Sequence, residues 1–475
     1  MNKESDMQFS IGKNPSIVSR ADFLRLSRDV LVSGALFLNG VNFSSEKEDL
    51  PERILTFTKL GPFNLIEKTS GGSEGVRAVY SSPNNHDKIF AGTWRSGFFV
   101  TQDGGKEWTK VELARNPNSP YPAWFEQKYP QNTAREIVHL RDDSYLIVSD
   151  KGISVLQSNS SGNPKVSNAS IDFEQLGDPS ETNCRKQILS PQTAIVFDGW
   201  VIVSGYNATC RTRSSEVLSG NPNWSLVKMG TLDIQHFRTF SQSKKTGVIY
   251  AGGWIYPDKK GAGTGLYVSH DAGESFEKHP FWEQITQHID AYESQRGMLI
   301  NIIKTIEHEG HELVIIGGEG SGNHTRDGYD QRKPFLEILV DGELYAGDLN
   351  LNELALQLGT DMVSPGGMVV CHKTGELFLA GYAREIASAS ISEIVEGHLF
   401  TQRLNNRVKK INWIRRSRDD SGRRDFGAIE LQISHDSWGA PYLIASGQTW
   451  EKPLRPVGVR RAKLANGVRK REKYI

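Results

Sequence analysis

The sequence has few cysteines, no excess of either charge and no long apolar run, and each shortage excludes a class of protein. Three cysteines in 475 residues, Cys184, Cys210 and Cys371, are too few for a disulfide-stabilised scaffold. We expect free thiols, with pairing of Cys184 and Cys210 as the alternative in an exported protein. The 56 basic side chains equal the 56 acidic ones, so charge does not favour nucleic acid as a partner. The apolar run at residues 30–38 is too short to span a bilayer, and we expect no membrane span.

The first 50 residues contain a pattern that concerns localisation. Residues Ser19–Arg25 resemble a twin-arginine export signal in which Ala21 replaces the second arginine, and the apolar run follows them. Arg28 and Asp29 stand directly before that run, and no Ala-x-Ala cleavage site follows it. We therefore expect a relic of an export signal or a short amphipathic helix, and a cytoplasmic protein. A working signal would instead make the protein periplasmic or exported.

From Gly75 onward the sequence repeats one order of elements. An apolar strand is followed by a turn, a second strand, a polar loop, a third strand, a turn and a fourth strand. Seven copies can be counted, and their first strands are expected at 76–80, 135–138, 193–197, 237–241, 302–307, 368–371 and 411–415. The sixth copy is expected to place its third strand at 389–394.

Seven such repeats predict an all-β fold, a single β-propeller of four-stranded blades. We expect it to occupy residues 51–451, after an N-terminal segment at 1–50 and before a basic tail at 452–475. The tail is expected to be solvated, with a weak contact surface for anions as the alternative. Residues 53–66 are predicted to add a strand to the last blade, because a closed ring leaves no open sheet edge.

Two turns share a further pattern. Thr101-x-Asp103-x-Gly105-x-x-Trp108 and Ser269-x-Asp271-x-Gly273-x-x-Phe276 resemble the Asp-box, or BNR repeat, of a β-propeller superfamily. The aspartate accepts hydrogen bonds from its own turn and the glycine adopts positive φ, so we expect a structural role. The resemblance implies a fold shared by sialidases and other glycoside hydrolases, sorting receptors and photosystem II assembly factors, without fixing an activity.

The loops between second and third strands share one end of such a ring, and aromatic, basic and acidic residues recur there. Loops on a rigid scaffold commonly build binding sites. We predict catalytic roles for Arg95, Tyr256, Asp258, Glu319 and Asp327. We predict ligand binding by Trp94, Trp254, Tyr382 and Arg384.

The innermost strands carry a second signal. Aligning their apolar residues places Arg77, Arg135, Arg238 and Lys304 at similar positions, from which all four could approach the central axis. Together they could bind a carboxylate, a sulfate or another anion through charge-assisted hydrogen bonds. The alternative is that each pairs with a nearby acid such as Glu74 or Glu136, or lines a water-filled channel.

The sequence has no recognised metal-ligand spacing and no glycine-rich nucleotide loop, so we expect no metal and no cofactor. We favour an enzyme whose ligand is a glycan or an anionic small molecule, with aromatic side chains stacking on sugar rings. The lack of a Phe/Tyr-Arg-Ile-Pro motif argues against a sialidase.

Two alternatives use the same fold. The chain is distantly similar to cyanobacterial natural-product enzymes that alkylate phenolic or carboxylate nucleophiles with alkyl halides, and Arg95, Tyr256 and Asp258 would suit that chemistry. A non-enzymatic assembly scaffold is the other alternative. The sequence does not predict an oligomeric state.

Overall fold

The computed structural model describes residues 53, 55–62, 74–116, 127, 131–158, 164–171, 191–205, 208–228, 236–254, 265–282, 299–319, 334–345, 347–349, 363–381, 386–403, 408–417, 430–449 and 458–464. Residues 50–475 form one compact unit. The predictions for residues 1–50 lie outside the described residues, as does Cys184.

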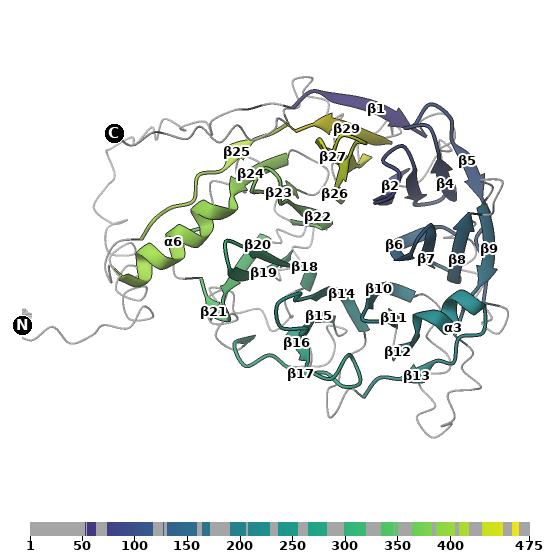
Figure 1. The fold of residues 1–475 in the computed structure, drawn as a ribbon, viewed down its shortest axis with the longest axis horizontal. Helices are drawn as coiled ribbons and strands as arrows, with labels where there is room; N and C mark the ends of the chain where they lie inside the picture. Colours follow the sequence, from purple (N-terminus) through teal and green to yellow (C-terminus); the bar gives the residue numbers. More distant parts are fainter. Residues whose placement is uncertain are drawn as a thin grey trace, which may run out of the picture. The chain divides into compact units, whose positions relative to one another are not determined.

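Seven antiparallel sheets surround a common axis, and each sheet is one blade (Figure 1). Blade 1 contains β2 (Glu74–Ser81), β3 (Ile89–Thr93), β4 (Phe98–Thr101) and β5 (Thr109–Val111), with β28 (Gln448–Thr449) beside β2. Blade 2 contains β6 (Ala134–Arg141), β7 (Ser144–Ser149), β8 (Gly152–Ser158) and β9 (Pro164–Asn168). Blade 3 contains β10 (Pro191–Phe197), β11 (Trp200–Gly205), β12 (Ala208–Arg213) and β13 (Ser225–Leu226), and α3 (Ser214–Ser219) follows β12.

The remaining blades repeat this order. Blade 4 contains β14 (His236–Gln242), β15 (Ile249–Trp254), β16 (Gly265–Ser269) and β17 (Glu277–Lys278). Blade 5 contains β18 (Leu299–His308), β19 (His311–Glu319), β20 (Pro334–Val340) and β21 (Glu343–Leu344). Blade 6 contains β22 (Val363–Cys371), β23 (Glu376–Gly381), β24 (Ile386–Ser390) and β25 (Ile414–Arg415), and α6 (Ile391–Arg403) follows β24. Blade 7 contains β26 (Glu430–His435), β27 (Pro441–Ser446), β29 (Val459–Lys463) and β1 (Phe57–Gly61).

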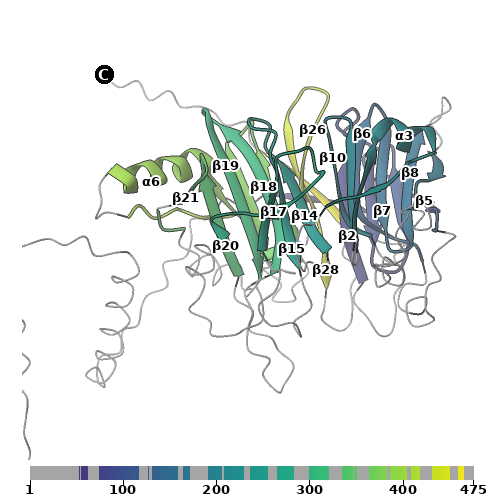
Figure 2. The same ribbon diagram turned by 90° about the horizontal axis from the view of Figure 1, so that it is seen from below.

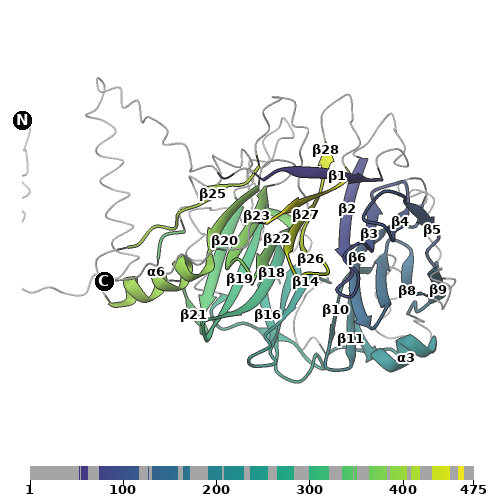
Figure 3. The same cartoon turned by 45° about the horizontal axis from the view of Figure 1, so that its top comes forward.

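The order of the last blade shows how the ring closes. β1, from the start of the described chain, pairs antiparallel with β29, from its end, and becomes the outermost strand of this blade (Figure 1; Figure 3 shows β1 from another side). The predicted closing strand is thus confirmed, and its bounds are Phe57–Gly61. The chain is a seven-bladed β-propeller.

The core lies between neighbouring sheets. Each blade buries one side of its strands against the next, as when Phe90 of blade 1 meets Tyr145 of blade 2 with ring centroids 4.5 Å apart. The innermost strand is an edge of its sheet, except that β28 pairs with the first residues of β2 in blade 1, so N–H groups on its open side need acceptors. Polar side chains of the preceding blade supply them: Glu136 accepts from Ala194 N–H at 3.3 Å, and Glu430 accepts from Val79 N–H at 2.6 Å.

The two Asp-box-like turns join third and fourth strands, where the sequence placed them. Asp103 accepts hydrogen bonds from the Lys106 and Glu107 N–H groups at 3.0 and 3.1 Å. Trp108 donates from its indole N–H to the Leu60 carbonyl of β1 at 2.8 Å. The turn in blade 1 therefore also fastens the closing strand.

Three predicted boundaries are wrong. Val459–Lys463, expected in a basic tail, form β29, which pairs with β27 and β1 and buries Val459 and Ala462 while the two arginines between them stay partly exposed. Ile414–Arg415, expected to open the last blade, are instead the outer strand of blade 6. The segment expected as a strand at 389–394 is mostly helical, because Ile391, Ile394, Val395 and His398 recur at helical spacing and are buried together.

We name the two ends of the ring by the connections found there. The loop face carries the links between second and third strands and those between blades. The turn face carries the links between first and second strands and between third and fourth strands. Figure 2 shows the blades from the side, with the β26–β27 hairpin extending on the turn face.

Candidate functional site

One position near the start of the innermost strand is irregular in blades 1 to 5. The pairing of first and second strands shifts by one residue there, which leaves a single residue in a β-bulge. The bulged residue is polar in all five blades: Arg77, Arg135, Gln192, Arg238 and Asn301. Because each first strand begins at the loop face, these side chains form a polar ring near that end of the axis.

Asn301, rather than Lys304, occupies this position in blade 5. Lys304 pairs with Ile315 and lies three residues further along β18. The predicted equivalence of Lys304 with the three arginines is therefore wrong, because the innermost strand of this blade was expected to begin at residue 302, whereas β18 begins at Leu299.

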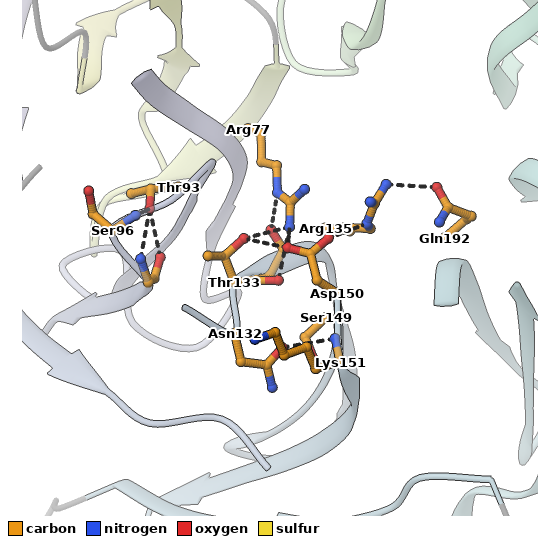
Figure 4. A network of polar contacts seen from close by, with 12 residues as sticks. Arg77, Thr93, Ser96, Asn132, Thr133, Arg135, Ser149, Asp150, Lys151 and Gln192 are labelled. Carbon is orange, nitrogen blue, oxygen red and sulfur yellow. Dashed lines mark hydrogen bonds and ion pairs between the residues drawn. The ribbon is translucent and has the colours of Figure 1, made fainter. Parts of the chain in front are cut away.

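Asp150 is the centre of the best-defined part of this ring (Figure 4). It follows β7 on the loop face and is fully buried. Arg77 donates to its Oδ2 from Nη2 at 2.5 Å, and Arg135 donates to its Oδ1 from Nε at 2.7 Å. Thr133 adds a hydroxyl hydrogen bond at 3.1 Å. Burial alone would raise the pKa of Asp150, but the two guanidinium groups outweigh it and lower that pKa.

The arginines also connect neighbouring blades. Arg77 of blade 1 donates to the Ala134 and Thr133 carbonyls of blade 2, both at 3.0 Å. Arg135 of blade 2 donates to Gln192 of blade 3 at 2.7 Å. Arg238 of blade 4 donates to Asn301 of blade 5 at 3.1 Å. The bulged side chains thus hold adjacent inner strands together at the loop face.

His236 reports the electrostatic character of this region. It opens β14 and is almost fully buried. Burial, followed by repulsion from Arg238 and Arg135, lowers the pKa of His236 well below its usual value. The imidazole is therefore neutral at pH 7, and Arg238 and Arg135 both lie close enough to act on it.

Two other predicted residues lie in the described turn of blade 1. The Arg77 guanidinium lies 5.1 Å from the Trp94 ring centroid, a cation–π contact. The Trp94 indole N–H is buried and has no hydrogen-bond partner among the described residues. Arg95 is half-buried in the same turn. Trp94 therefore joins the arginine cluster, and Arg95 lies next to it in sequence.

The other predicted loop residues are not brought together by the described structure. Tyr256, Asp258, Asp327, Tyr382 and Arg384 lie outside the described residues. For Glu319 and Trp254 only the backbone is described, at the loop-face ends of β19 and β15.

Further along the axis are two carboxylates that the sequence did not single out as a site. Burial raises the pKa of Glu136, and it raises the pKa of Glu430 well above its usual value. Lys304 acts on both in the opposite direction, so all three side chains share one environment. Glu136 does not pair with an arginine of the cluster in any contact described above; the acid that does is Asp150.

Asp150, Gln192 and Asn301 are the residues that sequence reasoning missed. A carboxylate directly after an apolar strand, as in Ser149-Asp150-Lys151-Gly152, was the available signal for Asp150. Within the part of the chain described here, no group of three or more His, Cys, Asp or Glu residues could hold a metal ion. None of the described helices is long and apolar enough to cross a membrane.

No protein-family model matches the sequence, and a search of curated proteins found no match. Solved structures give likenesses in fold. YCF48 bound to D1 peptide aligns with a TM-score of 0.45 and 11% identity, over 87% of this chain and 99% of that one. A catalytically inactive virginiamycin B lyase from Staphylococcus aureus with quinupristin gives 0.41 and 8%, over 86% and 99%. The GH74 xyloglucanase from Xanthomonas campestris gives 0.33 and 13%, over 82% and 59%. At such values the comparisons carry no argument about function.

Proposed function

We propose that the loop face binds a small anionic ligand at the axis of the ring. The observation that carries this proposal is that Arg77, Arg135 and Arg238 stand at the bulges of their inner strands, at the same end of the axis. Arg238 and Arg135 both lower the pKa of His236, so the two guanidinium groups lie close to one imidazole. A ligand carboxylate, sulfate or phosphate would accept charge-assisted hydrogen bonds from such groups.

The arginines have different parts in this proposal. Arg77 is buried and held by Asp150 and two backbone carbonyls, so it acts as a fixed support. Arg135 and Arg238 are only partly buried, and their planar guanidinium groups suit bidentate contact with an anion. The positions of both are set by the bulges, so little conformational freedom would be lost on binding.

Aromatic residues would provide the less polar part of the site. Trp94 stands beside Arg77 with a buried indole N–H that a ligand oxygen could accept from. The backbone of Trp254 pairs with that of His236, which brings β15 to the same end of the axis. Catalysis on the bound anion by Arg95, Tyr256, Asp258, Glu319 and Asp327 remains the prediction made from the sequence.

A ligand screen with one matched pair of variants tests the proposal. Acetate, sulfate, phosphate and glucuronate are titrated at low and high salt, with the melting temperature and calorimetric affinity as readouts. A ligand at a hundred times its Kd stabilises the folded state by about 2.7 kcal/mol. Arg238→Gln should weaken binding of the best anion at least tenfold, because it removes one charge and one planar donor.

Arg211→Gln is the control, because Arg211, in the third strand of blade 3, is also a partly buried arginine but pairs with Glu274 of the β16–β17 turn in blade 4. It should bind the anion like the wild type. The proposal fails if none of these anions stabilises the protein, or if Arg238→Gln and Arg211→Gln bind equally well.

A further inference from the structure

Trp438 is the most exposed large hydrophobic residue of the described chain, with 91% of its surface accessible. It stands in the β26–β27 turn on the turn face, the opposite end of the ring from the arginine cluster (Figure 2). The other exposed large hydrophobic side chains, such as Val408 at 56% and Leu226 at 42%, are accessible to a much smaller degree. Exposed tryptophan is enriched in the binding hot spots of protein interfaces.

Hydrogen bonds fix the conformation of the turn that carries Trp438. The Asp436 carboxylate accepts from the Trp438 and Ala440 N–H groups at 3.0 and 2.7 Å. Gly439 adopts φ of 75°, and its carbonyl accepts from the Lys373 ammonium of blade 6 at 2.6 Å. The backbone beneath the indole is therefore fixed before any partner arrives, which lowers the entropic cost of binding through this side chain.

The surroundings of the turn are basic on two sides. Lys373 lies on the blade 6 side, and Lys463 of β29 lies on the other, with its ammonium 6.0 Å from the Tyr442 ring centroid. The Asp436 carboxylate is engaged by its own turn and by the Tyr442 hydroxyl at 3.4 Å. A partner approaching Trp438 thus meets two lysines, while the acid is already hydrogen-bonded.

We propose that Trp438, Tyr442, Lys373 and Lys463 form a docking surface for an acidic segment of a partner protein that carries an apolar residue. The indole would pack on the apolar residue, and the lysines would pair with flanking carboxylates. This charge complementarity speeds association and selects acidic partners, whereas burial of the indole contributes most of the affinity. The surface is separate from the anion site and does not depend on it.

A peptide library tests this surface on the full-length protein. Random dodecapeptides displayed on phage are selected against the wild type, and the enriched sequences should combine several Glu or Asp residues with a large apolar residue. A fluorescein-labelled peptide made from the consensus should bind at least tenfold more weakly to Trp438→Ser. It should bind several-fold more weakly to Lys373→Gln/Lys463→Gln, and raised salt should reduce binding to the wild type.

Matched controls are Leu226→Ser, which removes another exposed apolar side chain, and Lys228→Gln, which removes an exposed lysine of blade 3. Both should bind the peptide like the wild type, and an unchanged melting temperature would show that Trp438→Ser is folded. Enrichment of peptides without acidic residues, or equal binding by Trp438→Ser, would overturn the proposal.

Two further results would assign the surface differently and overturn the proposal as well. One is Trp438-dependent binding to vesicles of phosphatidylcholine and phosphatidylserine in the absence of peptide selection. The other is a dimer of the wild type, measured by light scattering, that Trp438→Ser dissociates.

Discussion

Asp150→Asn is the substitution from which the arrangement at the loop face can be judged most directly. Asp150 has no accessible surface, and the side chains of Arg77 and Arg135 are 5% and 18% accessible. Removing one partner of a buried ion pair costs about 3–5 kcal/mol, because the remaining charge is left without compensation. Asparagine keeps one oxygen acceptor, so we expect the free energy of unfolding to fall by about 3 kcal/mol, near the lower limit.

Urea titration followed by circular dichroism measures this loss. Asp87→Asn is the control, because the Asp87 side chain is 42% accessible and its Oδ1 lies 3.8 Å from Arg461 Nη1, as in a surface ion pair. Such pairs contribute less than about 1 kcal/mol. If Asp150→Asn lowered the free energy of unfolding by no more than Asp87→Asn, the view that Asp150 holds the two arginines would be refuted.

The same variant links stability to the proposed anion site. The lowered pKa of Asp150 means that its stabilising effect is present above pH 4 and is lost as the pH falls through the folded-state pKa. The free energy of unfolding of Asp150→Asn should lack this decrease at acid pH. It should also bind an anion more tightly at pH 7, since it removes the only carboxylate shared by Arg77 and Arg135 in the network of Figure 4.

Two further substitutions test the fold and one titration. Gly105 has φ of +95°, and a Cβ there would lie 2.7 Å from the Leu60 Cβ of the closing strand, so Gly105→Ala should cost about 3 kcal/mol in unfolding free energy. Gly310→Ala, at φ of +83° with no atom within 4 Å, should cost only about 1 kcal/mol, and equal losses in urea titration would contradict the closing contact. Burial, and then His270, lowers the pKa of His279 to about 4, and His279 Nδ1 accepts from Phe281 N–H at 3.2 Å. The neutral imidazole stabilises the fold fully above about pH 6.5, and this effect is lost as the pH falls toward 4. Between pH 7 and pH 4.5, the free energy of unfolding of His279→Gln should therefore fall by about 1–2 kcal/mol less than that of the wild type. Parallel pH curves for the two proteins would show that the imidazole is not the group that titrates.

The fold could be predicted because its signal is repeated. Each blade needs apolar strands of similar length, and the two Asp-box-like turns fix the same connection in blades 1 and 4. The sequence pattern predicts strands wrongly where a blade departs from the repeat. In blade 6, α6 separates β24 from β25, so two residues of strand follow a long interruption and resemble the start of a new blade. In blade 7, the basic residues of β29 obscured a strand that has only two buried apolar residues, Val459 and Ala462.

The sequence predicted the arginines at the bulged positions of blades 1, 2 and 4, but not the register of blade 5. A sequence shows which residues are charged, but the residue that faces the axis depends on a bulge, and the bulge depends on how first and second strands pair. In blade 5 the apolar residues predicted a strand from residue 302, whereas β18 begins at Leu299, and this three-residue difference put Lys304 in the place of Asn301. The distinction is chemical as well as geometric, because Asn301 accepts from Arg238, whereas a lysine there would repel it.

The bulge also explains why one position can serve both stability and binding. A residue left out of the pairing is not fixed by the alternation of the strand, so its side chain can reach toward the next blade. Arg77 uses this reach to bind Asp150 in full burial, and Arg238 uses it to contact Asn301 while staying partly exposed. Substitutions should separate the two uses: loss of Arg77 should destabilise the ring, whereas loss of Arg238 should mainly weaken anion binding. The loss of unfolding free energy and the loss of anion affinity, both measured on these two variants, distinguish an arginine that binds the ligand from one that only stabilises the ring.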